Sequence, residues 1–366
     1  MLNIDRRSFL ALVAALSTQG TAQASSTDGD GLRARAAHHH RLFGASVASR
    51  NLTGDRQFAA AIAREAGVLV AEYETKRKAV EPSQGLFDFS GTDAILAFAR
   101  SNGQLMRGHT LVWHQANPAW LEDQILSTKS EALITDYIAK VAGRYKGHFQ
   151  SWDVVNEVVE PQDGHPDGLR SSSPWFKAYG EGYIDTAFHA ARAADPNALL
   201  FYNETNVEGD SDWFEQRRTA TLKLLERLVS RNVPIQGFGI QGHLKAYRAK
   251  YSQQVISKFL DEIGAMGLKV MITEFDVADT KGPVDPHKRD ADIAALTGMF
   301  LDTAFSKPFV LGCLTWGLTD KYSWLSQTPS YMWSDGQLPR GLPLDANFDR
   351  KPMWNAIASS FDRSAS

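Results

Sequence analysis

Ser-Trp-Asp-Val-Val-Asn-Glu, residues 151–157, is a short and mostly apolar run that ends on two polar residues. Similar short, near-continuous apolar runs recur along the chain and begin near Leu42, Leu69, Leu105, Leu199, Gly237, Lys269 and Val310. A strand that is apolar along its whole length is buried on both faces, as the strands of a parallel sheet are. The pattern therefore predicts eight strands in one parallel sheet.

Helical patterns separate the predicted strands. Ser130 and Ser252 are candidate N-caps for two apolar stripes, and Thr92 precedes a third stripe that Gly103 follows. Strands that alternate with helices over one uninterrupted span predict an α/β fold, a single-domain (β/α)8 or TIM barrel over residues 38–366. A doubly wound sheet is the alternative, although no Gly-x-Gly-x-x-Gly segment follows the first strand.

The composition is that of a globular protein without a basic block. The 366 residues are 43% hydrophobic and carry a formal net charge of −3, so nucleic acid is a poor candidate partner. Cys313 is the single cysteine, which excludes an intrachain disulfide, and its apolar surroundings predict a small core residue. We expect no cofactor, because the sequence has neither a phosphate-binding loop nor a cysteine cluster. We also expect a monomer.

The N-terminal residues have the order of an export signal. Asp-Arg-Arg-Ser-Phe-Leu at residues 5–10 leads into the apolar run Leu10–Leu16, and Ala22–Ala24 is a small-residue cleavage site. We predict a twin-arginine-type signal over residues 1–24, with an ordinary secretory signal as the alternative. The small and polar residues 25–37 predict a flexible leader. The mature chain is expected in the periplasm or the medium, with no membrane association after cleavage.

Polar and aromatic residues follow nearly every predicted strand. They are Glu72 and Lys76, His109 with Trp113 and His114, Asn156 and Glu157, Asn203 and Glu204, Gln241 and His243, Glu274 and Asp276, and Trp316. Taken singly, each has an ordinary structural explanation, such as a helix cap for a carboxylate or core packing for a tryptophan. In a barrel, however, the C-terminal strand ends meet at one rim, where catalytic groups lie. The recurrence predicts one site of carbohydrate size.

Glu157 and Glu274 end two predicted strands that face each other across the barrel mouth. Retaining glycosidases hold two carboxyl groups about 5–5.5 Å apart, one as the nucleophile and one as the acid that protonates the leaving oxygen. The nucleophile must stay ionised, which requires nearby hydrogen-bond donors such as His243 or Asn203. The pair therefore predicts glycoside hydrolysis.

Four segments together resemble glycoside hydrolase family 10, which consists mainly of endo-β-1,4-xylanases on a (β/α)8 barrel. They are Arg-Gly-His-Thr-Leu-Val-Trp-His (107–114), Trp-Asp-Val-Val-Asn-Glu (152–157), Ile-Thr-Glu-Phe-Asp-Val (272–277) and Thr-Trp-Gly-Leu-Thr-Asp (315–320). Their order fits the predicted strands, and the resemblance runs from about Leu42 to Ile357. It implies a retaining endo-xylanase that cuts xylan or xylo-oligosaccharides through a covalent glycosyl-enzyme intermediate.

The resemblance also implies roles for individual residues. Glu157 would be the general acid/base and Glu274 the nucleophile, oriented by His243. Asn156 would hold the 2-hydroxyl of the sugar whose bond is cut. Hydrogen bonds to that sugar or its neighbours are implied for Lys76, His109, Gln241 and Glu72. Surfaces against which sugar faces pack are implied for Trp113, Trp316 and Trp324.

The chain departs from the family pattern after the second and fifth strands, and three of these departures bear on substrate recognition. Where the family usually reads Glu-Asn-x-Met-Lys-Trp after the second strand, residues 72–77 place Tyr73 at the Asn and Arg77 at the Trp. After the fifth strand, Thr205 stands where the family commonly has Tyr. None of these changes touches the two glutamates. They predict altered recognition of sugar units away from the cut.

Three other functions compete with this interpretation. A metal-dependent hydrolase usually places a His-x-His pair on its first strand, whereas His38–His40 precede that strand, so we expect no metal site. A non-catalytic carbohydrate-binding barrel is disfavoured because both glutamates are present. A cellulase or mannanase would share the mechanism, and the bulk of Trp316 and Trp324 favours a sugar without a hydroxymethyl group.

Overall fold

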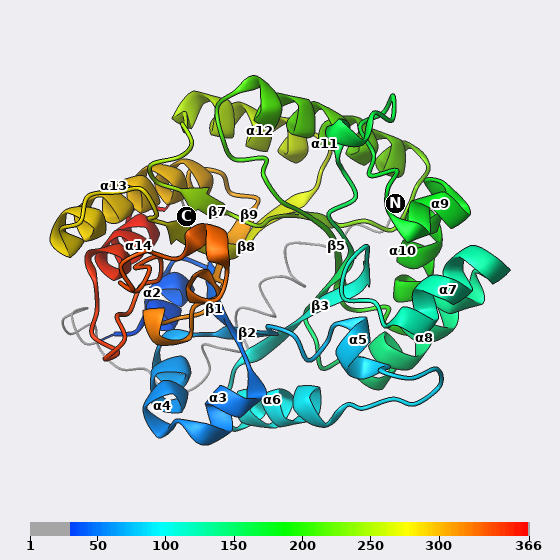
Figure 1. Ribbon diagram of the computed structural model, residues 1–366, viewed down its shortest axis with the longest axis horizontal. Coiled ribbons are helices and arrows are strands. Elements are labelled where there is room, and N and C mark those ends of the chain that lie inside the picture. The colour runs from blue at the N-terminus through cyan, green and yellow to red at the C-terminus, as the bar shows by residue number, and fades with distance from the viewer. Residues whose placement is uncertain (1–29, 365–366) are drawn as a thin grey trace.

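The computed structural model describes residues 30–364 and shows parallel strands closed into a barrel inside a ring of helices (Figure 1). The strands are β1 (Leu42–Val47), β2 (Val68–Ala71), β3 (Leu105–Trp113), β4 (Ser151–Asn156), β5 (Leu199–Glu204), β6 (Gly237–Ile240), β7 (His243–Lys245), β8 (Lys269–Ala278) and β9 (Val310–Thr315). Neighbours from β1 to β6 pair in order, β6 pairs with β8, and β9 pairs with both β8 and β1. Every pairing is parallel, and the β9–β1 pairing closes the ring.

This closed sheet confirms the predicted (β/α)8 barrel and excludes the doubly wound alternative, whose sheet has two open edges. All eight predicted strands are present, and each begins within one residue of its predicted position. The short strand β7, which pairs with the far end of β8, was not predicted. Gly242, with a backbone φ of +78°, separates it from β6, and three residues are too few to carry a periodic pattern.

The helices cover the outside of the barrel (Figure 1). They are α2 (Leu32–His38), α3 (Ser49–Gly54), α4 (Arg56–Glu65), α5 (Arg77–Val80), α6 (Ser90–Ser101), α7 (Ala119–Thr128), α8 (Ala132–Arg144), α9 (Pro174–Tyr179), α10 (Gly182–Ala194), α11 (Asp212–Ser230), α12 (Gln253–Ala265), α13 (Pro286–Phe305) and α14 (Pro352–Asp362). Short 3-10 turns are formed by Pro161–Asp163, Asp320–Tyr322, Trp324–Ser326 and Pro329–Tyr331. The last three belong to the long connection between β9 and α14.

One of the three predicted helix starts is confirmed, and two differ from the structure. Ser252 caps α12 as expected, because its hydroxyl accepts a hydrogen bond of 3.4 Å from the Val255 N–H. The Ser130 prediction is wrong, since α8 follows Glu131 and has no side-chain cap. Thr92 lies inside α6 rather than before it, and its hydroxyl donates to the carbonyl of Glu74 at 2.8 Å. Local sequence therefore located these helices but not always their first residue.

The predicted flexible leader, residues 25–37, is wrong for its second half. Residues Leu32–His38 form α2, in which Leu32 and Ala36 are completely buried. The Leu32 N–H also donates to the buried carboxylate of Glu65 at 2.8 Å. The small and polar composition concealed one apolar helix face, which ties this segment to α4.

The predicted export signal, residues 1–24, lies outside the described residues, and so do residues 25–29. Within residues 30–364, no helix is both long enough and apolar enough to cross a membrane.

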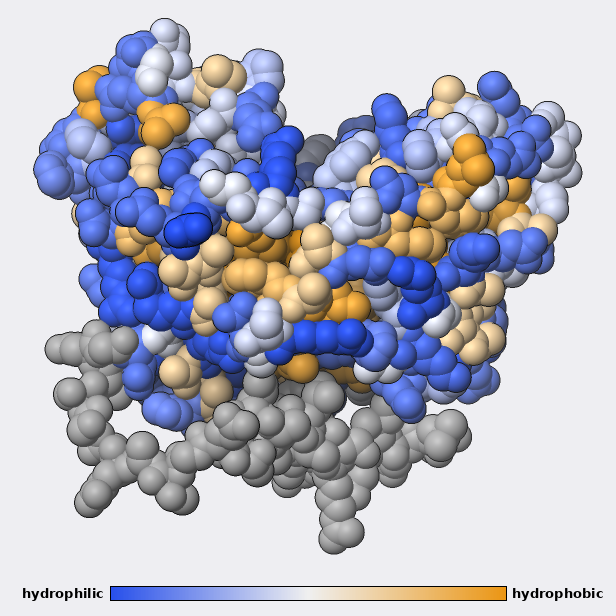
Figure 2. Space-filling view, turned by 90° about the horizontal axis from the view of Figure 1, so that it is seen from below, coloured by the Kyte–Doolittle hydropathy of each residue, from blue (hydrophilic) through white to orange (hydrophobic). Residues whose placement is uncertain are grey.

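The core has two layers. The larger layer fills the space between the strands and the helices, and it includes the buried side chain of Cys313. A smaller cluster joins side chains from several strands: Leu42, Val68, Val70, Phe201, Met271, Leu311, Leu314 and Trp316. Hydrophilic side chains predominate on the side of the molecule shown in Figure 2, although an apolar band crosses its middle. Packing on both faces of the sheet therefore fixes the positions of the strands and of the residues at their ends.

Candidate active site

A cleft lies at the rim where the C-terminal ends of the strands meet. Its volume is about 280 Å³, and it is lined by Lys76, His109, Trp113, Gln115, Asn156, Glu157, Thr205, Asn206, Gln241, His243, Lys245, Glu274, Trp316, Trp324 and Tyr331. Every predicted site residue except Glu72 is among them. The barrel therefore brings together side chains that stand up to 255 positions apart in the chain, from Lys76 to Tyr331.

Glu157 follows β4 in a backbone conformation that costs energy. Its φ of +54° lies in the left-handed region, where a residue with a Cβ is strained by on the order of 1–3 kcal/mol. The Glu157 N–H donates to the carbonyl of Asn203 at 2.9 Å, and Arg170 Nε donates to the Glu157 carbonyl at 2.8 Å. Both contacts fix the turn that aims the carboxyl group into the cleft.

The donors that bond directly to the Glu157 carboxyl group are neutral. Trp113 Nε1 donates to Oε2 at 3.0 Å, and Gln241 Nε2 donates to Oε1 at 2.9 Å. His114 Nε2 lies 4.0 Å from Oε2. Burial, followed by the nearby charge of Arg170, lowers the pKa of His114 to about 3, so this imidazole is neutral at physiological pH.

Glu274 lies within β8, and only 5% of its surface is exposed. Asn203 Nδ2 donates to its Oε1 at 2.7 Å, and His243 Nε2 lies 3.3 Å from its Oε2. Burial alone would raise the pKa of Glu274, but His109, His243 and Lys76 outweigh burial and lower it to about 2. This carboxylate is therefore ionised at any pH at which the barrel is expected to work.

His243 is held between two carboxylates. Its Nδ1 lies 2.9 Å from Asp276 Oδ1, and its Nε2 faces Glu274. Burial acts to lower the pKa of His243, yet the charge and hydrogen bond of Asp276, together with Glu274, raise it to about 10. A protonated imidazole donates through both nitrogens. The other oxygen of Asp276 accepts the indole N–H of Trp324 at 2.5 Å.

A buried polar floor supports the cleft from inside the barrel. Asp153 forms an ion pair with Arg107, and its second oxygen lies 3.0 Å from His109 Nδ1. Arg107 also donates to the Ser151 hydroxyl at 2.9 Å. All four side chains are almost fully buried, so this network is shielded from water. It orients His109, whose Nδ1 lies 3.9 Å from Glu274 Oε1.

Amide side chains connect the two glutamates. Asn203 Nδ2 donates to Glu274 and also to Asn156 Oδ1, the latter at 2.9 Å. Gln241 Nε2, which bonds to Glu157, lies 3.5 Å from the same Asn156 oxygen. Both carboxyl groups are thus fixed relative to one another by a continuous set of hydrogen bonds.

Aromatic rings and one cation form the walls beside Glu274. Lys76 Nζ lies 5.0 Å from the ring centroid of Trp113 and 5.4 Å from that of Trp316. Burial lowers the pKa of Lys76, while Glu274 is the largest of the charges that oppose this effect. Trp324 packs edge-on against Tyr331 on another part of the wall, with ring centroids 5.3 Å apart. Flat rings beside hydrogen-bonding groups suit the faces and hydroxyls of sugars.

Glu72 lies directly after β2 but does not line the cleft. Its N–H donates to the Val47 carbonyl at 2.9 Å, as if β2 continued for one more residue. Burial raises the pKa of the Glu72 carboxyl, and the charge of Lys76 opposes this shift. Glu72 therefore interacts by charge with the cleft residue Lys76.

The three departures from the family pattern differ in position. Tyr73 is 45% exposed, and Lys76 Nζ lies 5.8 Å from its ring centroid. Thr205 lines the cleft. Arg77, in contrast, is buried away from the cleft, where it pairs with Glu81 at 3.0 Å and covers the ring of Tyr137 at 4.1 Å. The Arg77 substitution therefore changes packing between α5 and α8 rather than a sugar contact.

Sequence reasoning missed four of the residues that line the cleft: Gln115, Asn206, Lys245 and Tyr331. Lys245 was detectable, because it stands two residues after His243 and alternate residues of a strand share a face. Tyr331 was not, since it belongs to a 3-10 turn in the long connection after β9. Such a connection carries no period that would assign a side chain to the cleft.

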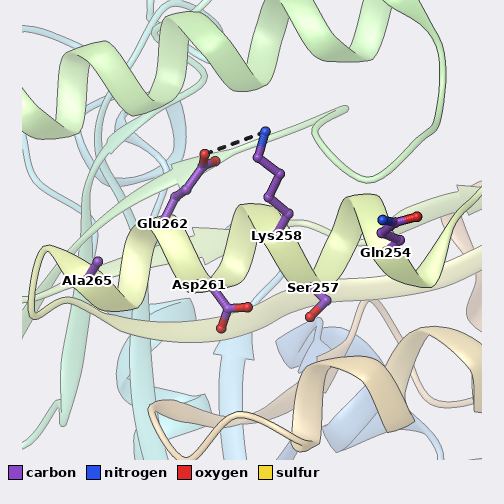
Figure 3. Close-up of a pocket in the computed structure, with 6 residues that line it drawn as sticks. All are labelled: Gln254, Ser257, Lys258, Asp261, Glu262 and Ala265. Atoms are coloured by element: carbon purple, nitrogen blue, oxygen red, sulfur yellow. Dashed lines mark ion pairs between the residues drawn. The ribbon is translucent and has the colours of Figure 1, made fainter.

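A second hollow lies on the outer face of α12, far from the strand ends (Figure 3). Its lining comes from this one helix: Gln254, Ser257, Lys258, Asp261, Glu262 and Ala265. Lys258 Nζ lies 3.9 Å from Glu262 Oε1, one turn along. A solvated helix face with an exposed ion pair is ordinary surface. The cleft at the strand ends is therefore the candidate active site.

A (β/α)8 barrel that holds two linked carboxyl groups in a cleft with tryptophan walls defines a glycoside hydrolase. Residues 31–360 match the sequence profile of Glycosyl hydrolase family 10. The chain belongs to this family, which confirms the resemblance found in its four motifs.

Named relatives agree with this assignment. The chain is 32% identical to Endo-1,4-beta-xylanase 1 of Humicola insolens over 87% of its own length and 71% of the relative. It is 33% identical to Beta-1,4-xylanase of Dictyoglomus thermophilum over 79% of the chain and 80% of the relative. Among solved structures it resembles native xylanase 10B from Thermotoga maritima, with a TM-score of 0.81 and 26% identity over 91% and 98% of the two chains. Xylanase 10B from Thermotoga petrophila, solved with xylobiose, gives a TM-score of 0.80 and 26% identity over 93% and 99%.

Proposed function

We propose that the protein is a retaining endo-β-1,4-xylanase that hydrolyses the xylan backbone by double displacement. The observation that supports this most is the contrast between two carboxyl groups in one cleft. Glu274 is buried and held ionised by a protonated His243, while Glu157 receives only neutral hydrogen-bond donors. A nucleophile must be ionised, and a general acid must be able to carry a proton, so the two environments suit different roles.

In the first step, a Glu274 carboxylate oxygen attacks the anomeric carbon of the bound sugar. The bond between this carbon and the glycosidic oxygen breaks, and the leaving oxygen takes the proton of Glu157. The product is an ester between Glu274 and the glycone part of the chain. Asn156, which Asn203 holds in place at 2.9 Å, would contact the sugar 2-hydroxyl during this step.

In the second step, Glu157 acts as a base. It removes a proton from a water molecule, whose oxygen attacks the same carbon and displaces Glu274. The sugar is released with its original anomeric configuration, because two inversions have occurred. Gln241 and Trp113, which bond to the two oxygens of Glu157, would orient it for both proton transfers.

The choice of xylan rests on the relatives. The named relatives above are xylanases, and the Thermotoga petrophila structure contains xylobiose. The cleft of this chain also places Trp316 and Trp324 beside Glu274 and His243. Bulky rings at this point leave little room for the hydroxymethyl group that glucose carries and xylose lacks. Both facts favour xylan over a β-glucan.

The experiment compares release of soluble sugars from xylan and from carboxymethyl-cellulose, for the wild type and Glu274→Ala, with and without a chelator. We expect chelator-resistant release of short xylo-oligosaccharides from xylan, abolished by the substitution. Cleavage of cellulose with xylan left intact would overturn the substrate. Loss of activity on adding the chelator would overturn the metal-free mechanism.

We also propose that residues 1–24 direct export through the twin-arginine route, because paired arginines precede the apolar run. The test fuses this segment to a reporter protein and follows its export. Replacement of Arg6 and Arg7 by lysine should block export. Undiminished export would instead identify an ordinary secretory signal.

A further inference from the structure

Lys245 places an unpaired cation in the cleft. It belongs to β7, and its Nζ donates to the side-chain oxygen of Asn206 at 3.2 Å. Within residues 30–364 this is the one hydrogen bond that the ammonium group makes, and no carboxylate lies within the 4.0 Å of an ion pair. An ammonium group carries three N–H donors, so two remain available to a bound molecule.

The carboxylates that act on Lys245 from a distance already have other partners. Glu208 accepts the Gly242 N–H at 2.8 Å, and Asp276 is held by His243 at 2.9 Å. Burial lowers the pKa of Lys245, Glu208 opposes this shift, and Arg248 and Arg217 lower the pKa further. Arg217 is itself paired with Glu160 and Glu204, whereas Arg248 is exposed and bonds to a backbone carbonyl. Among the described residues, the surroundings of Lys245 therefore supply no carboxylate that pairs with it, and a bound carboxylate would stabilise its charged form.

Lys245 differs in this respect from the other lysine of the cleft. Lys76 is enclosed by Trp113 and Trp316, and the strongest charge acting on it is that of Glu274. The charge of Lys76 thus acts mainly on the carboxylate of Glu274, the proposed nucleophile. The largest charge effects on Lys245 come instead from Glu208, Arg248, Arg217 and Asp276, so its cation is available for a different contact.

That contact lies in the part of the cleft that Thr205, Asn206 and Tyr331 line. Lys245 bonds to Asn206, which follows β5 together with the cleft residue Thr205, and Tyr331 completes this part of the lining. A neutral xylose unit offers only hydroxyl groups, which an amide would bind without the cost of partly burying a cation. A carboxylate is the group that a half-buried ammonium binds best.

We propose that Lys245 forms a carboxylate-binding subsite, which recognises a uronic acid branch of the xylan chain bound in the cleft. The inference rests on the proposed xylanase function and adds a preferred substrate class to it. The carboxylate oxygens of the branch accept the two remaining N–H groups of Lys245, and Arg248 adds a weaker attraction from the rim.

The test compares two probes that differ only at one carbon. The first is a xylo-oligosaccharide with one uronic acid branch, and the second is the same compound with its carboxyl group reduced to an alcohol. We expect the wild type to show a kcat/KM about fivefold to tenfold higher on the acid probe, as a charge-assisted hydrogen bond provides. This preference should shrink as the salt concentration rises.

Variants locate the effect. Lys245→Met should remove the preference by lowering kcat/KM on the acid probe alone, and Lys245→Arg should retain it. Lys258→Met, on the solvated face of α12 in Figure 3, is the matched control and should behave as the wild type. An equal loss on both probes for Lys245→Met would mean that Lys245 only shapes the cleft and would overturn the proposal.

The two proposals fail in distinguishable ways. Cleavage of both probes at equal rates by the wild type overturns the carboxylate subsite and leaves the xylanase function intact. Failure of the wild type to cleave either probe, or linear xylan, overturns the function itself. The wild-type comparison needs no variant, so it decides the question even where a Lys245 variant folds poorly.

Discussion

Each glutamate of the cleft has a histidine beside it, and one of these histidines is protonated while the other is neutral. His243, next to Glu274, is fixed by Asp276 and has a pKa raised to about 10. His114 lies beside Glu157, but its Nε2 is 4.0 Å from Glu157 Oε2, beyond hydrogen-bond distance, and burial lowers its pKa to about 3. The same residue type is a cation on one side of the cleft and neutral on the other.

This difference shows how one barrel assigns two chemical roles to the same side chain. A cation 3.3 Å from Glu274 favours its ionised form, whereas a neutral ring beside Glu157 exerts no such effect. The partner of each histidine decides the outcome, because Asp276 compensates the burial of one imidazole and nothing equivalent compensates the burial of the other. The predictions that follow test this asymmetry, beginning with the largest expected effect.

Removal of the ionised member should abolish catalysis on every substrate. Glu274→Gln keeps the size of the side chain but cannot form the ester, so kcat should fall by about 10⁴-fold or more. The measurement is turnover of xylan and of an aryl xyloside with a good leaving group. Glu262→Gln, on the outer face of α12, is the control. Substantial residual turnover would show that Glu274 is not the nucleophile.

Removal of the proton-carrying member should depend on the leaving group. Glu157→Gln lacks the acid, so activity on xylan should fall by about 10²- to 10⁴-fold. An aryl xyloside with an acidic phenol needs no protonation, so its first step should be nearly unaffected, and a burst of phenol should precede slow turnover. Equal losses on both substrates, without a burst, would contradict the general-acid role.

Removal of the cation should move the pH profile. His243→Gln removes two of the causes that lower the pKa of Glu274, so this pKa rises. Because Glu274 must be ionised, activity is lost as the pH falls through its pKa. The acidic limb of the kcat/KM profile should therefore move to higher pH, by about one unit. His114→Gln is the matched variant, and its acidic limb should stay where the wild type has it. A shift in both variants would show that the two histidines are equivalent.

The smallest effect is expected at the rim on the Lys76 side. Tyr73 is exposed and stands where family members usually carry a substrate-binding Asn. Tyr73→Asn should restore one hydrogen bond and raise kcat/KM on short xylo-oligosaccharides by about twofold to fivefold. Tyr73→Phe, which keeps the ring, is the control. Unchanged kinetics for Tyr73→Asn would show that the tyrosine does not face the sugar.

The sequence was sufficient to predict the barrel and the centre of the site. Eight short apolar runs recur along the chain, and the C-terminal ends of the strands they predict must meet at one rim, so the sequence alone predicts that Glu157 and Glu274 lie together. The opposite charge states of His114 and His243 were beyond prediction, because they depend on whether a carboxylate lies within hydrogen-bond distance in space.

Segments without a period account for most of what was missed. Residues of α2 read as a polar leader because a single apolar face, with Leu32 and Ala36, is a weak signal in seven residues. Arg77 stands where the family pattern usually has a Trp, and here it packs against Tyr137 and pairs with Glu81. A side chain that turns to a different partner cannot be detected from its place in a motif.

The indole of Trp324 does two things at once, because its ring lines the cleft while its N–H bonds to the aspartate that holds His243. A substitution of Trp324 by a smaller residue, made to admit a bulkier sugar, also removes a hydrogen bond from Asp276. Asp276 then holds His243, the cation beside Glu274, less firmly. Substrate range and working pH are therefore coupled traits at this position. A substitution of Trp324 that broadens the substrate range therefore also changes the working pH. Residues such as Tyr73, which do not bond to Asp276 or His243, can change the substrate range without this effect.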